Sequence, residues 1–257
     1  MKKNLRKLTQ KLGVLPYIQV FKERYFPTEY VKEAIKGQKK YLDFYSQFIN
    51  KGDLCFDIGA NIGHRTEIFL KLGAKVVAVE PQKDLFRYLK IKYKNKIQLE
   101  NCGLGSGFRV QTMFINDASA LSTFSDDMVK NSRFSDTEWI NKRQVQIKTL
   151  DSLIEKYGVP QFCKIDVEGY EYEVLSGLSK KIPYTSIEFA LPENLQVLKD
   201  SISHIINLTE GAEFNYALGD DMVLASEKWF KAKNIQEFYN EKIFRESSWG
   251  DVYMKMK

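Results

Sequence analysis

Short apolar runs alternate with amphipathic stretches along most of the chain, which predicts strands and helices in turn. Aromatic residues in 29–49 recur at spacings of three and four, so they predict a helix whose aromatic stripe packs on a core. Further on, the pattern predicts helices at 63–72, 83–92 and 193–206 and strands at 54–58, 75–79, 97–101, 162–167, 184–190, 213–218 and 221–226. This alternation indicates an α/β, Rossmann-like fold with a seven-stranded, mostly parallel sheet and helices on both faces.

The 257 residues fit one α/β domain with an addition at each end. We expect a basic helical N-terminal extension over 1–50, the main domain over 51–227, and a C-terminal extension over 228–257 that packs on it. Segments 108–115 and 143–149 look extended, and a long polar insert separates them. Long inserts are often lids or binding loops, so we expect this one to form part of a substrate wall.

Positive charge is concentrated at the N-terminus, where residues 1–40 hold eleven Lys or Arg against three Glu while the whole chain carries +6. This segment could attract an anionic partner such as a phosphorylated sugar, a nucleic acid or a membrane face, or it could be a solvated helical face. No run of about 18 apolar residues is present, so we expect no membrane span. The three scattered cysteines fit reduced, buried thiols, and we expect a cytoplasmic protein.

A glycine turn follows the first expected strand, where the sequence reads Asp57-Ile-Gly-Ala-Asn-Ile-Gly63. Gly59 and Gly63 lack a Cβ, so the backbone can turn sharply and approach a ligand closely. Glu80 ends the next apolar run, 21 positions beyond Gly59. An acid about 20 residues after such a turn can reach ribose hydroxyls. The pattern therefore predicts a pocket for a nucleoside-bearing cofactor.

Asp57 distinguishes this turn from a dinucleotide site, which usually reads G-x-G-x-x-G because backbone amides cradle the pyrophosphate. A carboxylate at the strand end would repel a pyrophosphate and attract a cation, such as the amine or sulfonium of S-adenosylmethionine. An NAD(P)-dependent oxidoreductase is therefore the less favoured alternative. Asp57 and Asn61 could also be ordinary turn residues.

A second acidic motif, Phe162-Cys-Lys-Ile-Asp-Val-Glu-Gly-Tyr-Glu171, ends another expected strand. Asp166 and Glu168 lie two positions apart, so they would share a face at the carboxyl end of the sheet, where open parallel sheets bind ligands. Lys164 shares that face and could pair with one of them. Glu168 and Glu171 could instead be first-turn acids that favour the positive end of a helix dipole.

The order and spacing of these motifs resemble those of the FkbM-type family of S-adenosylmethionine-dependent methyltransferases. The resemblance covers residues 41–190 and rests on the glycine turn, Glu80-Pro81, Thr149-Leu150-Asp151 and Lys164–Glu171; Ser248–Tyr253 is also similar. It implies a class I methyltransferase fold, S-adenosylmethionine as cofactor with S-adenosylhomocysteine as product, and an oxygen acceptor, often on a sugar or polyketide. A nitrogen acceptor stays open as an alternative.

Methyl transfer from a sulfonium mainly requires that donor and acceptor be positioned and water be excluded. A hydroxyl acceptor must also lose a proton, which a nearby carboxylate could accept. Asp166 and Glu168 are the expected candidates because two neighbouring carboxylates raise one pKa. Asp166 is also expected beside the cofactor. Glu188, an acid within an apolar strand, is a third candidate unless an Arg or Lys partner explains it.

Other site residues are expected from position alone. Cys102 and Gly103 follow the third strand, and the resemblance places this loop against the adenine. His64 could face the pocket or cap a helix. No His lies near Cys or acids at metal-ligand spacing, so we expect no metal, although Asp166 with a later acid could bind a divalent ion as in catechol-type methyltransferases. A non-catalytic nucleic-acid-binding module is a further alternative, but no aromatic RNA-binding signature supports it.

Overall fold

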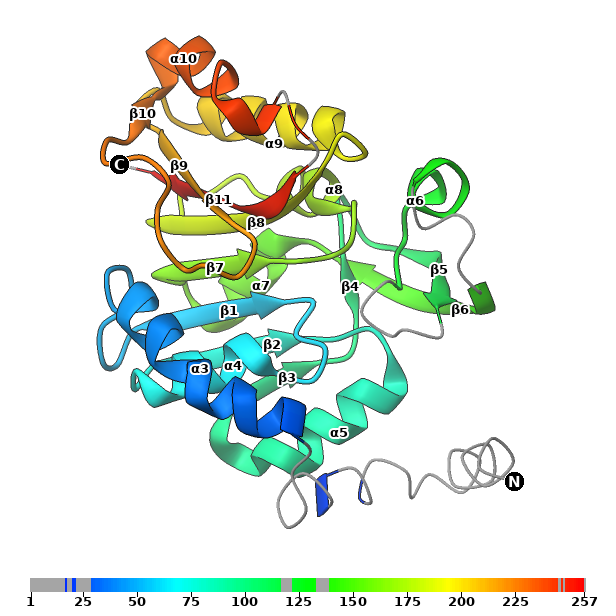
Figure 1. Cartoon of the computed structure of the whole chain (residues 1–257). Helices are drawn as coiled ribbons and strands as arrows, with labels where there is room; N and C mark the ends of the chain where they lie inside the picture. The colour runs from blue at the N-terminus through cyan, green and yellow to red at the C-terminus, as the bar shows by residue number, and fades with distance from the viewer. Residues whose placement is uncertain are drawn as a thin grey trace.

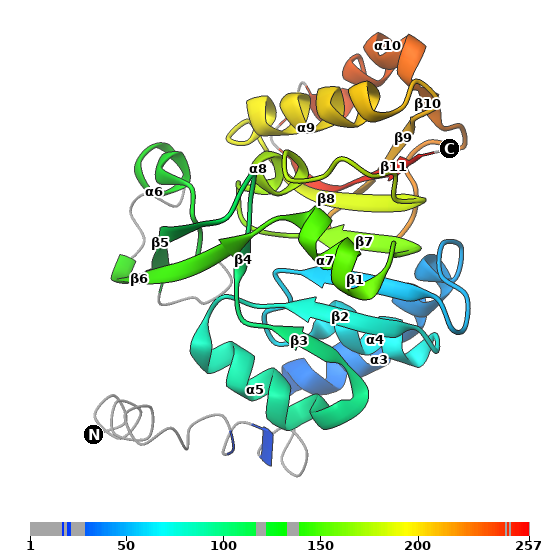
Figure 2. The ribbon, with the colours of Figure 1, turned by 180° about the vertical axis from the view of Figure 1, so that it is seen from behind.

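The computed structural model describes residues 17, 20–21, 29–116, 122–132, 139–244, 246 and 248–256. Helices cover both faces of a central sheet, and a smaller sheet lies at its side (Figure 1; Figure 2). The strands are β1 (Leu54–Ile58), β2 (Lys75–Val79), β3 (Gln98–Glu100), β4 (Gly103–Leu104), β5 (Arg109–Asn116), β6 (Trp139–Lys148), β7 (Phe162–Ile165), β8 (Tyr184–Leu191), β9 (Glu213–Leu218), β10 (Phe230–Lys231) and β11 (Ser248–Lys255). The helices are α3 (Glu29–Tyr45), α4 (His64–Lys71), α5 (Lys83–Tyr93), α6 (Asp126–Asn131), α7 (Leu150–Tyr157), α8 (Glu171–Leu175), α9 (Leu195–Leu208) and α10 (Ile235–Tyr239), with short 3-10 turns at Lys94–Lys96, Ala232–Asn234 and Lys242–Phe244.

The central sheet has the strand order β10-β9-β11-β8-β7-β1-β2-β3. Strands β1, β2, β3, β7 and β8 pair in parallel, whereas β11 runs antiparallel to both of its neighbours. The two-residue strand β10 only extends one edge. This arrangement confirms the predicted Rossmann-like sheet of the class I methyltransferase type, with its carboxyl ends gathered at one edge.

The expected strand at 221–226 is wrong. This segment returns alongside β9, and the Ala225 N–H donates a hydrogen bond to the Tyr216 carbonyl, but the segment forms no strand. The place beside β9 is taken by β11, which pairs with β8 along eight residues and with β9 along six. A strand that hydrogen-bonds along both edges satisfies more backbone groups than a single return contact. Part of the segment expected as a C-terminal extension, 248–255, therefore lies inside the sheet.

The aromatic stripe of α3 and the turn after it is buried, as predicted. Tyr41, Phe44, Tyr45 and Phe48 are each at most 6% exposed. The Tyr45 ring meets Phe162 of β7 edge-on at 5.5 Å, and the Phe48 ring stacks on Tyr253 of β11 at 5.6 Å. The N-terminal helix thus closes one face of the sheet together with α4 and α5.

The opposite face packs against α7, α8 and α9 through apolar side chains such as Leu153, Val174 and Ile202. Beside it, β4, β6 and β5 form the small sheet, in which β5 and β6 are antiparallel. These strands confirm the extended segments predicted at 108–115 and 143–149. The insert between them contains α6, which begins at a Ser125 side chain that accepts a hydrogen bond from the Met128 N–H. Its segments 117–121 and 133–138 lie outside the described residues.

None of the helices in the described part of the chain is long and apolar enough to cross a membrane. The basic segment 1–28 lies, except for residues 17, 20 and 21, outside the described residues, so an anionic partner for it stays a prediction.

Phe162 lies at the centre of the core under α3, fully buried between Tyr45, Phe48 and Phe69. We expect Phe162→Ala to lower the free energy of unfolding by about 3–5 kcal/mol, because it removes a large ring and leaves a cavity. Urea denaturation measures the loss. Phe108→Ala is the matched control, since that ring is 73% exposed and its removal should cost less than about 0.5 kcal/mol. Equal losses in the two variants would contradict this account of the core.

Candidate active site

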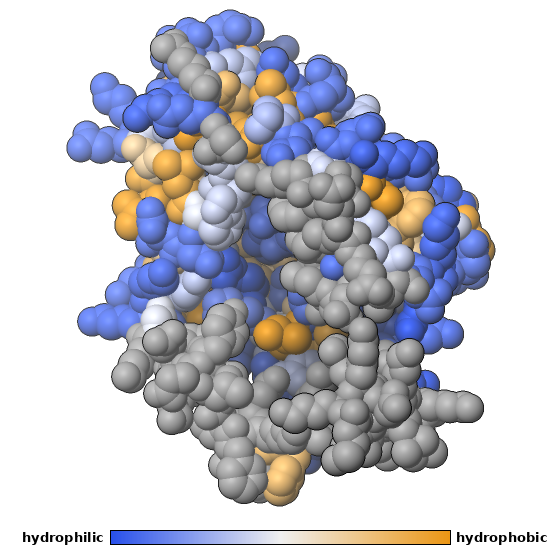
Figure 3. Space-filling model, turned by 45° about the vertical axis from the view of Figure 1, so that its right-hand side comes forward, coloured by the Kyte–Doolittle hydropathy of each residue, from blue (hydrophilic) through white to orange (hydrophobic). Residues whose placement is uncertain are grey.

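A cavity of about 850 Å³ opens at the carboxyl edge of the central sheet. Figure 3 brings this edge forward and shows a recessed, mostly hydrophilic centre between the grey segments. Residues of four neighbouring strands and of the loops after them line the cavity: Gly59 after β1, Glu80 after β2, Asp166 after β7 and Glu188 within β8. The volume lies within the range of small-molecule and cofactor sites.

The glycine turn brings the β1 loop against the β7 loop. Gly59 has φ of +84°, and a Cβ there would lie only 1.8 Å from the carbonyl oxygen of Asp166. Gly63, with φ of +80°, is equally confined, because a Cβ would lie 2.7 Å from the Tyr93 ring. Both glycines are therefore required by contacts within the protein, in addition to the ligand approach that the sequence predicted.

Glu80 joins the ends of β1 and β2 and lines the cavity, as its expected role requires. Its carboxyl oxygens accept hydrogen bonds from the backbone N–H groups of Asn61 and Gln82, both at 2.8 Å. Burial raises the pKa of Glu80 to about 7, although these hydrogen bonds oppose the rise. Each oxygen keeps an acceptor position for a further donor such as a ribose hydroxyl. The residue thus fits the ribose of a nucleoside cofactor.

Asp57 is buried at the end of β1 and also lines the cavity. Its carboxylate accepts a hydrogen bond of 2.5 Å from the Thr66 hydroxyl of α4. Burial raises the pKa of Asp57, while the Thr66 hydrogen bond and the nearby charge of Lys164 lower it. A bound cation would stabilise the ionised form, so the position suits the amine or sulfonium of S-adenosylmethionine.

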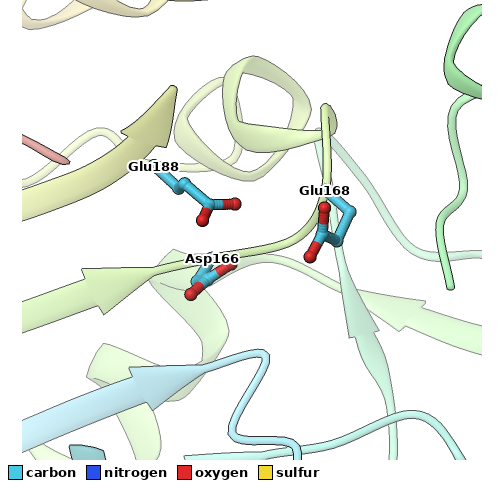
Figure 4. A group of neighbouring side chains, drawn as sticks. All are labelled: Asp166, Glu168 and Glu188. Atoms are coloured by element: carbon cyan, nitrogen blue, oxygen red, sulfur yellow. The ribbon is translucent and has the colours of Figure 1, made fainter. Parts of the chain in front are cut away.

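Three carboxyl groups that line the cavity gather near one another at the end of β7 and in β8, as Figure 4 shows. Oxygens of Asp166, Glu168 and Glu188 all lie within 4.8 Å of one another. Burial and the charge of Asp166 raise the pKa of Glu168 and Glu188 well above their ordinary range. Burial raises the pKa of Asp166, but the Lys164 ammonium, a hydrogen bond with Glu188 and the charge of Arg65 together outweigh burial and hold this pKa below its ordinary value. The cluster therefore sets one acid that favours its ionised form beside two acids that favour their protonated forms.

Lys164 controls this division of charge. Its ammonium is almost fully buried and donates to Asp251 of β11 at 2.8 Å and to Asp166 at 3.3 Å. The predicted pairing of Lys164 with one motif acid is confirmed. Asp251 is the register partner of Glu188, so β11 brings a further charge beneath the cluster.

The loop that carries Glu168 is fixed from two sides. One carboxyl oxygen of Glu171 accepts hydrogen bonds from the N–H groups of Val167 and Gly169, at 3.1 and 3.2 Å. The Thr123 hydroxyl donates to the Glu168 carbonyl at 2.7 Å. Glu168 itself has φ of +55°, a left-handed conformation that such contacts must hold. Glu171 is thus a loop-fixing acid at the start of α8, which agrees with the structural alternative given for it.

The spacing of these three carboxyl groups would also allow them to bind a divalent cation. The expectation that the site uses no metal stays a prediction.

Cys102 and Gly103 are placed differently from the other predicted residues. Cys102 is buried, and Gly103 lies in β4, where a Cβ would touch Ile147 and Phe124 within 2.8 Å. Neither belongs to the cavity lining, whereas Phe124 does, together with Met113 and Ser122. Their contact with an adenine stays a prediction. Since Ser122 and Phe124 belong to the polar insert, part of that insert does line the cavity.

His64, Arg65, Asp220 and Trp249 also line the cavity. The sequence allowed His64 either to face the pocket or to cap a helix, and the structure places it in the cavity lining. Sequence reasoning missed the other three. The similarity of Ser248–Tyr253 to the family was a signal for Trp249, and the place of Arg65 directly after the glycine turn was a signal for that residue. Asp220 follows a glycine in an ordinary turn and had no distinguishing pattern.

Comparison with known proteins identifies a family and several distantly similar structures. The profile described as "Methyltransferase FkbM domain" matches residues 57–216. Similar solved structures include an O-methyltransferase from Bacillus cereus in complex with SAH (12% identity, 93% of this chain and 96% of that chain covered, TM-score 0.46) and a TehB-like SAM-dependent methyltransferase from Corynebacterium glutamicum (11%, 85% and 88%, 0.43). A third is a precorrin-6y C5,15-methyltransferase from Geobacter metallireducens GS-15 (8%, 84% and 87%, 0.41). A comparison with curated proteins finds no match.

The fold and the family match together identify a class I methyltransferase that uses S-adenosylmethionine. The profile match covers more than half of the chain, and the protein belongs to the FkbM methyltransferase family. The family match therefore favours a methyltransferase over the two alternatives, an NAD(P)-dependent oxidoreductase and a non-catalytic nucleic-acid-binding module.

We expect Gly59→Ala to weaken S-adenosylhomocysteine binding about tenfold or more, because the added methyl group would force the β1 and β7 loops apart. Isothermal titration calorimetry measures the affinity. Gly52→Ala is the matched control, since Gly52 also has a positive φ of +93° but nothing within 4 Å of an added Cβ. It should cost about 1 kcal/mol of stability and leave the affinity unchanged. Equal affinity in both variants would contradict the loop contact.

The raised pKa of Glu80, about 7, predicts a pH dependence. Only the ionised carboxylate accepts both ribose hydroxyls, so S-adenosylhomocysteine affinity should increase between pH 6 and 8, and Glu80→Gln should be weaker and lose that part of the increase. Stability should change in the opposite direction. The folded state holds this proton more tightly than the unfolded state, so Glu80 stabilises the fold at low pH and loses that contribution as pH rises through about 7.

Calorimetry measures the S-adenosylhomocysteine affinity, and urea denaturation measures the stability, of wild type and Glu80→Gln between pH 6 and 8. A difference between wild type and Glu80→Gln that does not change with pH would contradict the assignment.

Proposed function

We propose that this enzyme methylates a hydroxyl group on a sugar, a glycan or another small molecule. The observation that carries the proposal is the carboxyl cluster of Asp166, Glu168 and Glu188, which lies in the same cavity as the cofactor residues Asp57 and Glu80. A hydroxyl is a weak nucleophile until its proton is accepted, and a positioned carboxylate can accept it. The cluster supplies such a group within the cavity.

S-adenosylmethionine, when bound, supplies an electrophilic methyl group on its sulfonium. Around it, Asp57 and Glu80 bind and orient the donor, while the half-buried carboxyl cluster holds the acceptor. Asp166 is the proton acceptor of the proposal, because Lys164 keeps it ionised near neutral pH. Burial and the charge of Asp166 raise the pKa of Glu168 and Glu188, and in their protonated forms these acids can donate hydrogen bonds to acceptor oxygens.

The cavity wall supports a sugar-like acceptor. Trp249 lines the cavity from β11 and is 50% exposed, and Gly219 beneath it leaves only 3.4 Å between an added Cβ and the indole. Phe124 forms apolar wall from the insert. Aromatic surfaces beside carboxyl groups match a ring that has apolar faces and hydroxyl edges.

The proposal includes a cytoplasmic location. All three cysteines are free and buried, which supports a reducing compartment.

Assays with labelled methyl donor against panels of sugars, nucleotide sugars, phenols and amines test the acceptor class. Label transferred only to amines would contradict the proposal.

With an accepted sugar, we expect Asp166→Asn to lower kcat about 100-fold or more, because the proton acceptor is lost while the shape is kept. S-adenosylhomocysteine affinity, measured by calorimetry, should stay close to wild type, since Lys164 keeps Asp251 as its partner. Glu173→Gln is the matched control; Glu173 is an acid on α8 that pairs with Arg109 outside the cavity lining. If Asp166→Asn retained full turnover, the assigned proton acceptor would be wrong.

A further inference from the structure

Arg65 is a cation within a cavity whose charged lining residues are mostly acids. It lies in the first turn of α4, its side chain is 16% exposed, and it lines the cavity together with Asp57. Its guanidinium lies 4.6 Å from the centre of the Tyr41 ring. This stacking and the burial fix the group in place at the edge of the cofactor site.

The hydrogen bonds of this guanidinium are incomplete. Nη1 lies 2.9 Å from Nδ1 of His64, and Nη2 donates to Asp220 at 3.2 Å. Nε is buried and has no hydrogen-bond partner among the described residues. The edge formed by Nε and Nη2 is thus held at one end only, by an aspartate whose side chain is 54% exposed. Such an edge fits a carboxylate that binds through both of its oxygens.

The other described cations at or near the cavity are either paired with other groups or exposed at the surface. Lys92 donates to the Ile62 carbonyl at 3.1 Å and lies 3.7 Å from Glu67. Lys94 is exposed. Lys164 is held between Asp251 and Asp166. Arg65 is therefore the cation best placed, within the described part of the chain, to meet a buried anion.

The methyl donor carries such an anion. Its methionine part has a carboxylate beside an amine and a sulfonium, and the two cationic groups suit Asp57 and the neighbouring acids. The carboxylate, however, would be repelled by the same acids unless a positive charge faced it. We propose that Arg65 binds the methionine carboxylate of S-adenosylmethionine through Nε and Nη2, with the bound carboxylate taking over the place of Asp220.

This inference rests on the cofactor site described above and adds a carboxylate subsite to it. The test compares S-adenosylmethionine with decarboxylated S-adenosylmethionine, which keeps the amine, the sulfonium and the nucleoside and lacks only the carboxylate. Calorimetry measures both affinities in wild type, Arg65→Met and Arg65→Lys, and melting temperatures show whether each variant is folded.

We expect Arg65→Met to weaken S-adenosylmethionine binding about 10- to 100-fold and to leave the decarboxylated analogue unchanged or tighter. Arg65→Lys should fall between Arg65→Met and wild type, because it keeps the charge and loses the two-point geometry. Arg87→Met, which removes an arginine of α5 outside the cavity lining, should change neither affinity.

Equal weakening of both compounds by Arg65→Met would show that Arg65 only holds the local fold, and no weakening of either would show that the carboxylate binds elsewhere. Both results overturn the inference. They differ from a failure of the cofactor site itself, in which wild type would bind neither compound.

Discussion

The contact between the turn after β1 and the turn after β7 is the constraint on which the site depends. With 1.8 Å between a Gly59 Cβ and the Asp166 carbonyl, no side chain can separate the two loops. Their closeness places Asp57 beside Asp166 and sets the donor residues next to the proposed acceptor residues. Pairing of β1 with both β2 and β7 then brings Glu80 to the same cavity from the other side.

The second requirement is electrostatic. Several acids point into one enclosed space, and burying each as a separate charge would be costly. The structure limits the cost because one buried ammonium, that of Lys164, stabilises Asp166 and Asp251, while the raised pKa of Glu168 and Glu188 favours their neutral forms. The same arrangement leaves the cavity ready for a cationic donor. Site chemistry and stability therefore depend on the same few charges.

Much of this could be predicted from the sequence, because the decisive signals are local. The glycine turn, the spacing to Glu80 and the alternate acids Asp166 and Glu168 depend on strand ends, which apolar runs mark well. The position of β11 could not be predicted, because β11 inserts between β8 and β9, which lie far from it in the sequence, and such an insertion leaves no short-range signal. Arg65 and Trp249 were missed for a related reason. Their role comes from facing a cavity that only the assembled sheet creates.

The insertion of β11 between β8 and β9 has a consequence for biosynthesis. The ribosome makes this strand after both of its neighbours, so those strands must wait with open edges while the rest of the chain emerges. Until β11 enters, Lys164 lacks Asp251 and the cavity lacks Trp249. Completion of the pocket thus coincides with closure of the sheet, and a nascent chain halted before 248 would expose unpaired strand edges to aggregation and hold a cavity without its Trp249 wall.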